Sequence, residues 1–230
     1  WSAQGQGATS DLNAIWGSGG ERLWAAGGGG TILRSDGTTW VTQESGVTSE
    51  LFALSGTGEE SLWAVGADGA IVHWDGRAWT TQESGTTNDL YGVWAVDSRN
   101  AWAVGAAGTT LRWDGTTWGA QSSGTLFDLR GVWATGIDHI WTVGAAGTIL
   151  KWNGTGWEAQ VSGTVAGLRG VWGLDEKNVW AVGQNETILR WDGKTWASQT
   201  RSYPLDLRAV WGVDATHIWA VAETVLGGTS

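Results

Sequence analysis

Residues 89–127 read DLYGVWAVDSRNAWAVGAAGTTLRWDGTTWGAQSSGTLF, and this stretch contains four short runs of apolar, β-branched or aromatic residues. The runs cover 90–95, 101–104, 109–113 and 117–121, and the residues between them are rich in Gly, Asp, Asn and Ser, which are typical of turns. None of the runs keeps a helical period of about 3.6 residues. The stretch therefore predicts four antiparallel strands, of which the last two are joined by a tight hairpin at 114–117.

The same pattern recurs every 39 residues, and the tryptophans mark its register. The chain has 21 tryptophans, and each one falls in one of four series with this spacing, with serine in three otherwise vacant places. The series are Trp24, Trp63, Trp102, Trp141, Trp180 and Trp219; Trp1, Trp40, Trp79, Trp118, Trp157 and Trp196; Trp16, Trp94, Trp133, Trp172 and Trp211, with Ser55; and Trp74, Trp113, Trp152 and Trp191, with Ser35 and Ser230. A fixed period of this kind indicates a repeat protein.

A four-stranded antiparallel unit of about 40 residues has the size of one β-propeller blade. We therefore predict an all-β, six-bladed β-propeller that forms a single domain over 1–230. The predicted blades are 11–49, 50–88, 89–127, 128–166, 167–205, and a last blade that combines 206–230 with 1–10. In this last blade the N-terminal strand takes the place of the fourth strand, so that it closes the ring and removes open strand edges.

The pattern L-x-G-V-W-G, V-W-A-V-G and G-T-I-L-R-W-D-G-T-T-W resembles the Trp-rich tandem repeats of bacterial surface and secreted β-propellers, which are distant relatives of WD-repeat and Asp-box propellers. The resemblance covers the whole chain. It implies a propeller fold and a location outside the cell or on its surface. Because propellers host lectins, enzymes and plain scaffolds, the resemblance by itself does not assign an activity.

Most of the tryptophans are predicted to fill the space between neighbouring blades, because large side chains keep packed sheets apart. The Trp24 and Trp40 series are unbroken in all six repeats, which favours this structural role. The Trp74 series tolerates serine, which suits a partly exposed rim where rings stack on sugars, as in six-bladed Trp-rich lectins; filling the space between blades is the alternative for this series as well.

A basic series precedes the Trp74 series in sequence and supplies hydrogen-bond donors for sugar hydroxyls, although a solvated or salt-bridged position is an alternative for it. The candidate ligand-binding residues are Trp74, Trp113, Trp152, Trp191, Arg34, His73, Arg112, Lys151 and Arg190. Because adjacent residues of a strand face opposite sides of the sheet, each such site has to be shared between blades.

Acidic residues open the predicted first strands, at Asp11, Glu50, Asp89, Asp128 and Asp206. Capping of their own loops is favoured over a ring of cation ligands. For catalysis, the chain has no cysteine and no HExxH, nucleophile-elbow, phosphate-loop or EF-hand pattern, and its three histidines fall in different repeats. We therefore expect no catalytic residue, no metal and no cofactor, and we expect that the protein is not an enzyme.

The charge balance of 13 Lys and Arg against 23 Asp and Glu gives a net charge of −10, which argues against a nucleic-acid partner. No apolar run approaches the roughly 18 residues of a membrane span, so no membrane insertion is expected. The sequence favours a monomeric, multivalent binding module for glycans, in which avidity multiplies weak sites. The alternative is a structural or protein-interaction propeller, either a piece of a longer repeat array or an engineered repeat protein.

Overall fold

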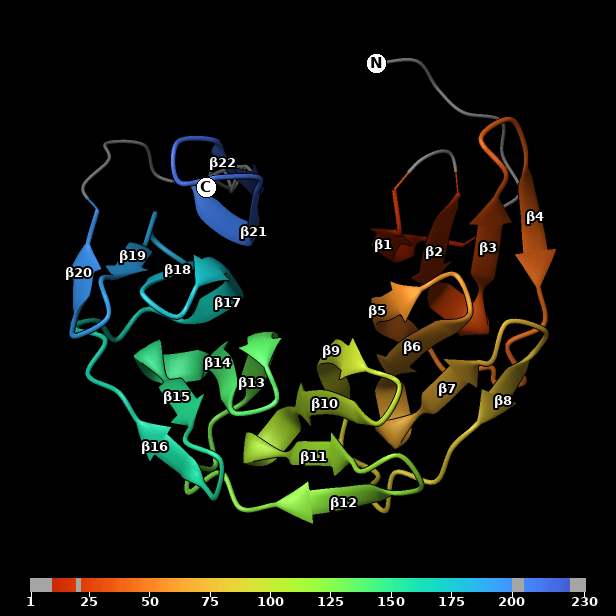
Figure 1. Ribbon diagram of the computed structural model, residues 1–230, viewed down its shortest axis with the longest axis horizontal. Coiled ribbons are helices and arrows are strands. Elements are labelled where there is room, and N and C mark those ends of the chain that lie inside the picture. Colours follow the sequence, from red (N-terminus) through yellow and green to blue (C-terminus); the bar gives the residue numbers. More distant parts are fainter. Residues whose placement is uncertain (1–9, 20–21, 200–204, 224–230) are drawn as a thin grey trace, which may run out of the picture. The chain divides into compact units, whose positions relative to one another are not determined.

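Figure 1 shows a computed structural model that describes residues 10–19, 22–199 and 205–223. The chain divides into two compact units, the first ending at Gln121 and the second beginning at Ser122. The described residues form β-strands and single turns of 3-10 helix. None of the described segments is a helix long and apolar enough to cross a membrane.

The first unit contains three four-stranded sheets, numbered here 1 to 3 in chain order. Sheet 1 consists of β1 (Leu12–Gly17), β2 (Leu23–Gly27), β3 (Ile32–Ser35) and β4 (Trp40–Gln43); sheet 2 of β5 (Leu51–Gly58), β6 (Ser61–Gly66), β7 (Ile71–Trp74) and β8 (Trp79–Thr81); and sheet 3 of β9 (Leu90–Asp97), β10 (Asn100–Gly105), β11 (Thr110–Trp113) and β12 (Trp118–Gln121). Consecutive strands pair in antiparallel fashion, so each sheet is a simple meander.

The second unit contains two further four-stranded sheets and a two-stranded one, numbered 4 to 6. Sheet 4 consists of β13 (Leu129–Gly136), β14 (His139–Gly144), β15 (Ile149–Trp152) and β16 (Trp157–Ala159); sheet 5 of β17 (Leu168–Asp175), β18 (Asn178–Gly183), β19 (Ile188–Trp191) and β20 (Trp196–Ser198); and sheet 6 of β21 (Asp206–Gly212) and β22 (Ile218–Glu223). The predicted all-β fold with repeated four-stranded antiparallel units is thus confirmed, and it is consistent with a propeller. The predicted closing strand, with Trp1 and Ser230, lies outside the described residues.

The hairpin between the third and fourth strands forms where the sequence predicted it. In sheet 3, Gly115 has a φ of +98°, and the Asp114 carboxylate accepts hydrogen bonds from the backbone N–H groups of Thr116 and Thr117 at 2.8 and 2.9 Å. The bond from Thr117, followed by those from Thr116, lowers the pKa of Asp114 to about 2. The aspartate therefore stabilises this turn in its ionised form.

A single 3-10 turn joins the second and third strands of sheets 1 to 4: η1 (Gly28–Gly30), η2 (Ala67–Gly69), η3 (Ala106–Gly108) and η4 (Ala145–Gly147). Its last residue is glycine because the backbone passes very close to another segment. At Gly147, where φ is +69°, an added Cβ would lie 2.0 Å from the carbonyl oxygen of Thr164. The connection that leaves sheet 4 is therefore packed directly on η4.

The hydrophobic cores lie between neighbouring sheets within each unit. One core joins Trp63 and Ile71 of sheet 2 to Leu90 and Trp113 of sheet 3. A second set of contacts places first-strand tryptophans over small residues of the next sheet; an added Cβ at Gly173 would lie 2.5 Å from the Trp133 ring. Sheet stacking through bulky side chains is the interior expected of propeller blades.

Candidate functional site

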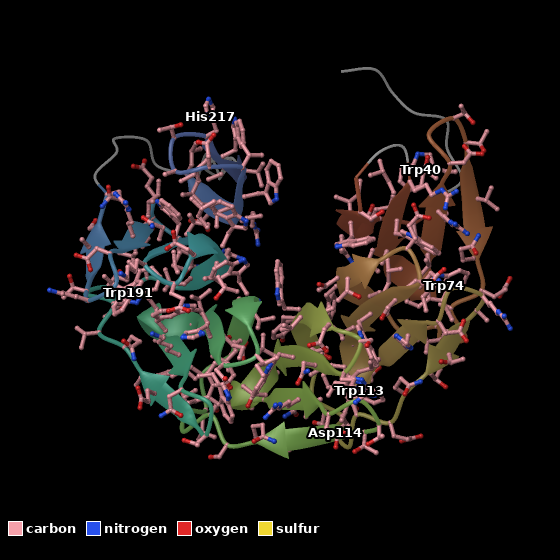
Figure 2. The ribbon with its side chains drawn as sticks, viewed as in Figure 1. Trp40, Trp74, Trp113, Asp114, Trp191 and His217 are labelled. Atoms are coloured by element: carbon pink, nitrogen blue, oxygen red, sulfur yellow. The ribbon has the colours of Figure 1, made fainter. Side chains whose placement is uncertain are left out.

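The tryptophans that were predicted to separate the blades form buried clusters between sheets. Trp24 of sheet 1 lies with its ring centroid 4.9 Å from that of Trp74 and 5.6 Å from that of Trp79, both in sheet 2. Figure 2 labels Trp74 together with Trp113 and Trp191 of the same series. The same arrangement joins Trp63 to Trp113 and Trp118, and Trp141 to Trp191 and Trp196. The prediction that the Trp24 and Trp40 series fill the space between sheets is confirmed for these clusters.

The candidate basic residues lie on the same clusters. The Arg34 guanidinium is 5.1 Å from the ring centroid of Trp24 in its own sheet and 5.9 Å from that of Trp74 in the next sheet. The Lys151 ammonium is likewise 5.1 Å from Trp141 and 5.8 Å from Trp191. A basic residue therefore meets the Trp74-series residue of the following sheet, as expected for a site shared between blades.

The prediction of a partly exposed rim for the Trp74 series is wrong. Trp74, Trp113, Trp152 and Trp191 have exposed fractions of only 4, 9, 3 and 7%. Three of them also use their indole N–H inside their own sheet: Trp74, Trp113 and Trp191 donate to the backbone carbonyls of Glu59, Ser98 and Glu176. A pyranose needs an open ring face, and these rings are already covered by protein.

Serine in this register does not indicate exposure either. Ser35 is 5% exposed, and its Oγ accepts a hydrogen bond from the backbone N–H of Gly37 at 3.0 Å. A small polar side chain therefore fills a buried place by bonding to its own turn.

The donors of the basic series are partly engaged within the protein. Arg190 donates to the side-chain oxygen of Asn178 at 2.9 Å and is exposed, whereas Arg34, His73, Arg112 and Lys151 are half-buried. His73 stacks on Trp63 with ring centroids 4.1 Å apart, and burial lowers the pKa of its imidazole. The arrangement is that of cation–π contacts which cover the edges of the tryptophan clusters.

Two members of the acidic series, Asp89 and Asp206, act on turns of the neighbouring sheet rather than on their own loops. The Asp89 carboxylate accepts from the backbone N–H of Asp68 in η2 at 3.0 Å, and that of Asp206 accepts from Asn185 at 3.1 Å. These carboxylates thus connect consecutive sheets. Among the described residues no group of three or more His, Asp or Glu side chains is placed to hold a metal ion.

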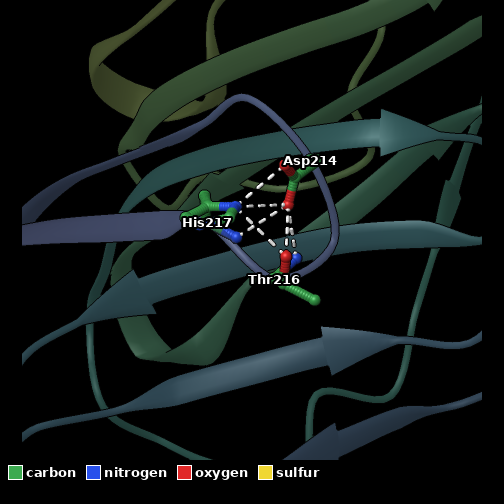
Figure 3. Close-up of polar contacts among 3 residues, drawn as sticks. All are labelled: Asp214, Thr216 and His217. Carbon is green, nitrogen blue, oxygen red and sulfur yellow. Dashed lines mark hydrogen bonds and ion pairs between the residues drawn. The ribbon is translucent and has the colours of Figure 1, made fainter.

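One histidine lies beside both an aspartate and a hydroxyl, in the turn between β21 and β22 (Figure 3). His217 Nδ1 is 2.9 Å from the Asp214 carboxylate and 3.1 Å from the Thr216 hydroxyl, and hydrogen bonds from Thr216 and His217 hold the pKa of Asp214 well below its usual range. In a catalytic triad the nucleophile and the acid contact different nitrogens of the imidazole. Here both contact the same nitrogen, so the cluster has the geometry of a turn cap.

A groove that the sequence did not predict lies at sheet 4, within the second unit. This open groove, of about 940 Å³, lies between residues 123–125 and Phe127 of the connection that enters the sheet and the segment 157–165 that leaves it, with η4 and the start of β15 as its floor. The residues 39 positions further on line an equivalent groove of about 340 Å³ at sheet 5. A signal was present in the sequence. At one repeat position, sheets 1 and 2 are followed by Thr48 and Thr87, whereas sheets 3 and 4 are followed by Leu126 and Val165.

No family model and no curated protein matches the chain. Solved structures do match it: YCF48 bound to a D1 peptide (TM-score 0.50, 15% identity, 94% of this chain and 92% of that chain) and YCF48 from Cyanidioschyzon merolae (0.50, 16%, 95% and 94%). The WD40 repeats of RRP9 match with a TM-score of 0.75 and 10% identity over 89% of this chain and 71% of that chain. At these identities the likeness shows the fold alone, which is that of repeat propellers.

Proposed function

We propose that the chain is a non-enzymatic propeller module that binds a protein partner. The observation that carries this proposal is the burial of every described tryptophan in the Trp74 series, which leaves no ring face of that series for a sugar, while large apolar side chains are exposed on connections between sheets. Exposed apolar side chains that gather on one surface are typical of protein interfaces. Support also comes from a similar fold that has been solved with a bound peptide, YCF48.

Carbohydrate binding remains a prediction from the resemblance, as do a bacterial source and a location outside the cell. Its physical basis is weaker than that of protein binding, because sugar recognition needs an accessible aromatic face beside free hydrogen-bond donors. A closed ring of six blades in a monomer also remains a prediction, since residues 1–9 and 224–230 lie outside the described part of the chain. The absence of enzymatic activity is part of the proposal.

The test is a paired screen of the full chain. A random 12-residue peptide display library is selected on the folded chain and, as a control, on the chain unfolded in denaturant; a broad glycan array is probed in parallel and followed by tryptophan-fluorescence titration. We expect peptides that are enriched on the folded chain alone, and no saturable response to glycans. Saturable glycan binding without enrichment of any peptide would overturn the proposal in favour of a lectin.

A further inference from the structure

Exposed large apolar side chains gather mainly in three places among the described residues. Two of these groups lie in sheets 1 and 6, the first and last sheets, which adjoin in sequence the segments 1–9 and 224–230; because those segments are outside the described residues, exposure there does not define a free surface. The third group lies on the two connections that border sheet 4, where Leu126, Phe127, Val161 and Val165 are 87, 54, 87 and 88% exposed. Among the described residues, these four side chains are therefore not part of the hydrophobic core of the second unit.

The groove of sheet 4 runs between these two connections, and its walls are held by side-chain hydrogen bonds. On the entering side, Ser123 Oγ donates to the carbonyl of Thr125 at 3.2 Å, and the Thr125 hydroxyl accepts from the N–H of Phe127 at 3.1 Å. On the leaving side, Ser162 Oγ donates to the carbonyl of Thr164 at 3.2 Å. A ligand that enters the groove therefore meets walls that are already ordered, which reduces the entropy lost on binding.

The apolar residues on the two connections distinguish sheet 4 from sheet 2 and are not a property of every repeat. The four places occupied by Leu126, Phe127, Val161 and Val165 hold Thr48, Ser49, Glu83 and Thr87 in the register of sheet 2. In the groove of sheet 5, the places of Ala146 and Ala159 hold Asn185 and Ser198. All of these positions are on the surface, so packing does not explain the replacement of polar by apolar residues at sheet 4.

The floor of the groove ends at an open strand edge. The N–H of Gln160 donates to the carbonyl of Ile149 at 2.9 Å, and Leu150 faces Ala159 in the register of β15 and β16. In an antiparallel pair the hydrogen-bonded and non-hydrogen-bonded residues alternate, so the N–H and C=O of Ala159 point away from β15. Ala159 is exposed and lines the groove, so an extended chain can pair with it.

Charge defines the partner further. The residues that line the groove include no Asp, Glu, Lys or Arg, so the bound segment has to be uncharged where it contacts the walls. The chain as a whole carries a net charge of −10, which attracts cationic partners and repels acidic ones.

We propose that the groove of sheet 4 binds an extended peptide segment of a partner protein. Apolar side chains of the segment contact Phe127, Val161 and Val165, its main chain pairs with Ala159 at the edge of β16, and Lys or Arg residues flank it. The inference rests on the proposed protein-binding function and assigns it to one place on the molecule.

The experiment uses the full chain and the 12-residue peptides that the display library enriches on it. A groove variant carries Leu126→Thr, Phe127→Ser, Val161→Glu and Val165→Thr, which gives sheet 4 the residues of sheet 2. The matched control carries Thr48→Ala, Ser49→Ala, Glu83→Ala and Thr87→Ala at the equivalent places of sheet 2. Melting temperature and tryptophan fluorescence establish that each variant is folded, and the single variant Phe127→Ser replaces the groove variant if it is not.

We expect enriched peptides to carry an uncharged apolar stretch flanked by basic residues, to bind the groove variant at least about tenfold more weakly, and to bind the control variant as they bind the original chain. Ala159→Pro removes the outward N–H and is expected to weaken binding as well. Peptides that bind the folded groove variant undiminished would overturn the groove but leave a protein-binding function standing. A library that yields no peptide on the folded chain would overturn both.

Discussion

Replacing Trp74 by alanine tests whether the Trp74 series is structural. The side chain is 4% exposed, lies against Trp24 and Trp79 at centroid distances of 4.9 and 5.9 Å, and receives the Arg34 guanidinium at 5.9 Å. Its indole N–H donates to the carbonyl of Glu59 at 3.0 Å. Truncation therefore removes an inter-sheet contact and leaves that carbonyl without this donor.

The expected loss follows from these contacts. A buried tryptophan removes roughly 150–250 Å² from water, which at about 25 cal/mol per Å² corresponds to about 4–6 kcal/mol. Truncations of large aromatic side chains in cores cost about 3–5 kcal/mol, and we expect a loss of this size for Trp74→Ala. At about 2–4 °C per kcal/mol for a chain of this length, the melting temperature falls by roughly 6–20 °C.

The assay is calorimetric and denaturant-induced unfolding, with Phe127→Ala as the control. Phe127 is 54% exposed, so its truncation is expected to cost about 1 kcal/mol or less. Equal losses for the two variants, or a loss below about 1 kcal/mol for Trp74→Ala, would refute a structural role for Trp74. Weakened binding to glycans with unchanged stability would instead restore the predicted sugar site.

Three further changes have expected outcomes. Because the pKa of Asp114 is lowered to about 2, its contribution to stability is complete above about pH 4 and is lost as the pH falls toward 2. Asp114→Asn is expected to reduce this acid dependence in a chemical denaturation series, since Asn153 already makes the same turn in sheet 4. Burial lowers the pKa of His73, so the free energy of unfolding is expected to fall as the pH drops below about 6.5. His73→Arg, which restores the usual residue of the series, is expected to remove this step between pH 7.5 and 5.5, and an unchanged step would contradict the assignment of the step to His73. Gly147→Ala adds a Cβ 2.0 Å from the Thr164 carbonyl at a φ of +69° and is expected to cost about 2–4 kcal/mol, whereas a neutral effect in thermal unfolding would show that the connection is not packed on η4.

The strands and hairpins of the fold could be predicted from the sequence because each repeat imposes the same local constraints. Asp114 and Gly115 define a hairpin in any context, since the carboxylate bonds to its own turn and only the glycine adopts a positive φ at no cost. The contact of Trp24 with the next sheet also followed from the pattern, because a tryptophan kept in every repeat has to be covered by something that repeats.

The burial of the Trp74 series could not be predicted from variation alone. A serine among tryptophans looked like a sign of exposure, yet Ser35 is as buried as Trp74. The target of the Asp89 carboxylate was also out of reach, because the N–H that it accepts from belongs to Asp68 in another sheet. Local capping rules predict that such a carboxylate accepts from a backbone N–H, but which residue supplies that N–H depends on how two sheets pack.

Structural and functional departures from the repeat differ in whether the contact between neighbouring sheets is kept by another interaction. Trp133 requires glycine at position 173, because a Cβ there would lie 2.5 Å from its ring. Where Ser55 replaces the tryptophan of this series, the residue 40 positions later is Ala95, and its N–H donates to the serine hydroxyl at 3.1 Å. At this place a hydrogen bond to the next sheet replaces a ring contact, and the interface is kept. Phe127, Val161 and Val165, which line the sheet 4 groove, are instead 54, 87 and 88% exposed. Exposing apolar area to water costs free energy, so these departures are explained by a partner that covers them and not by the packing of the blades.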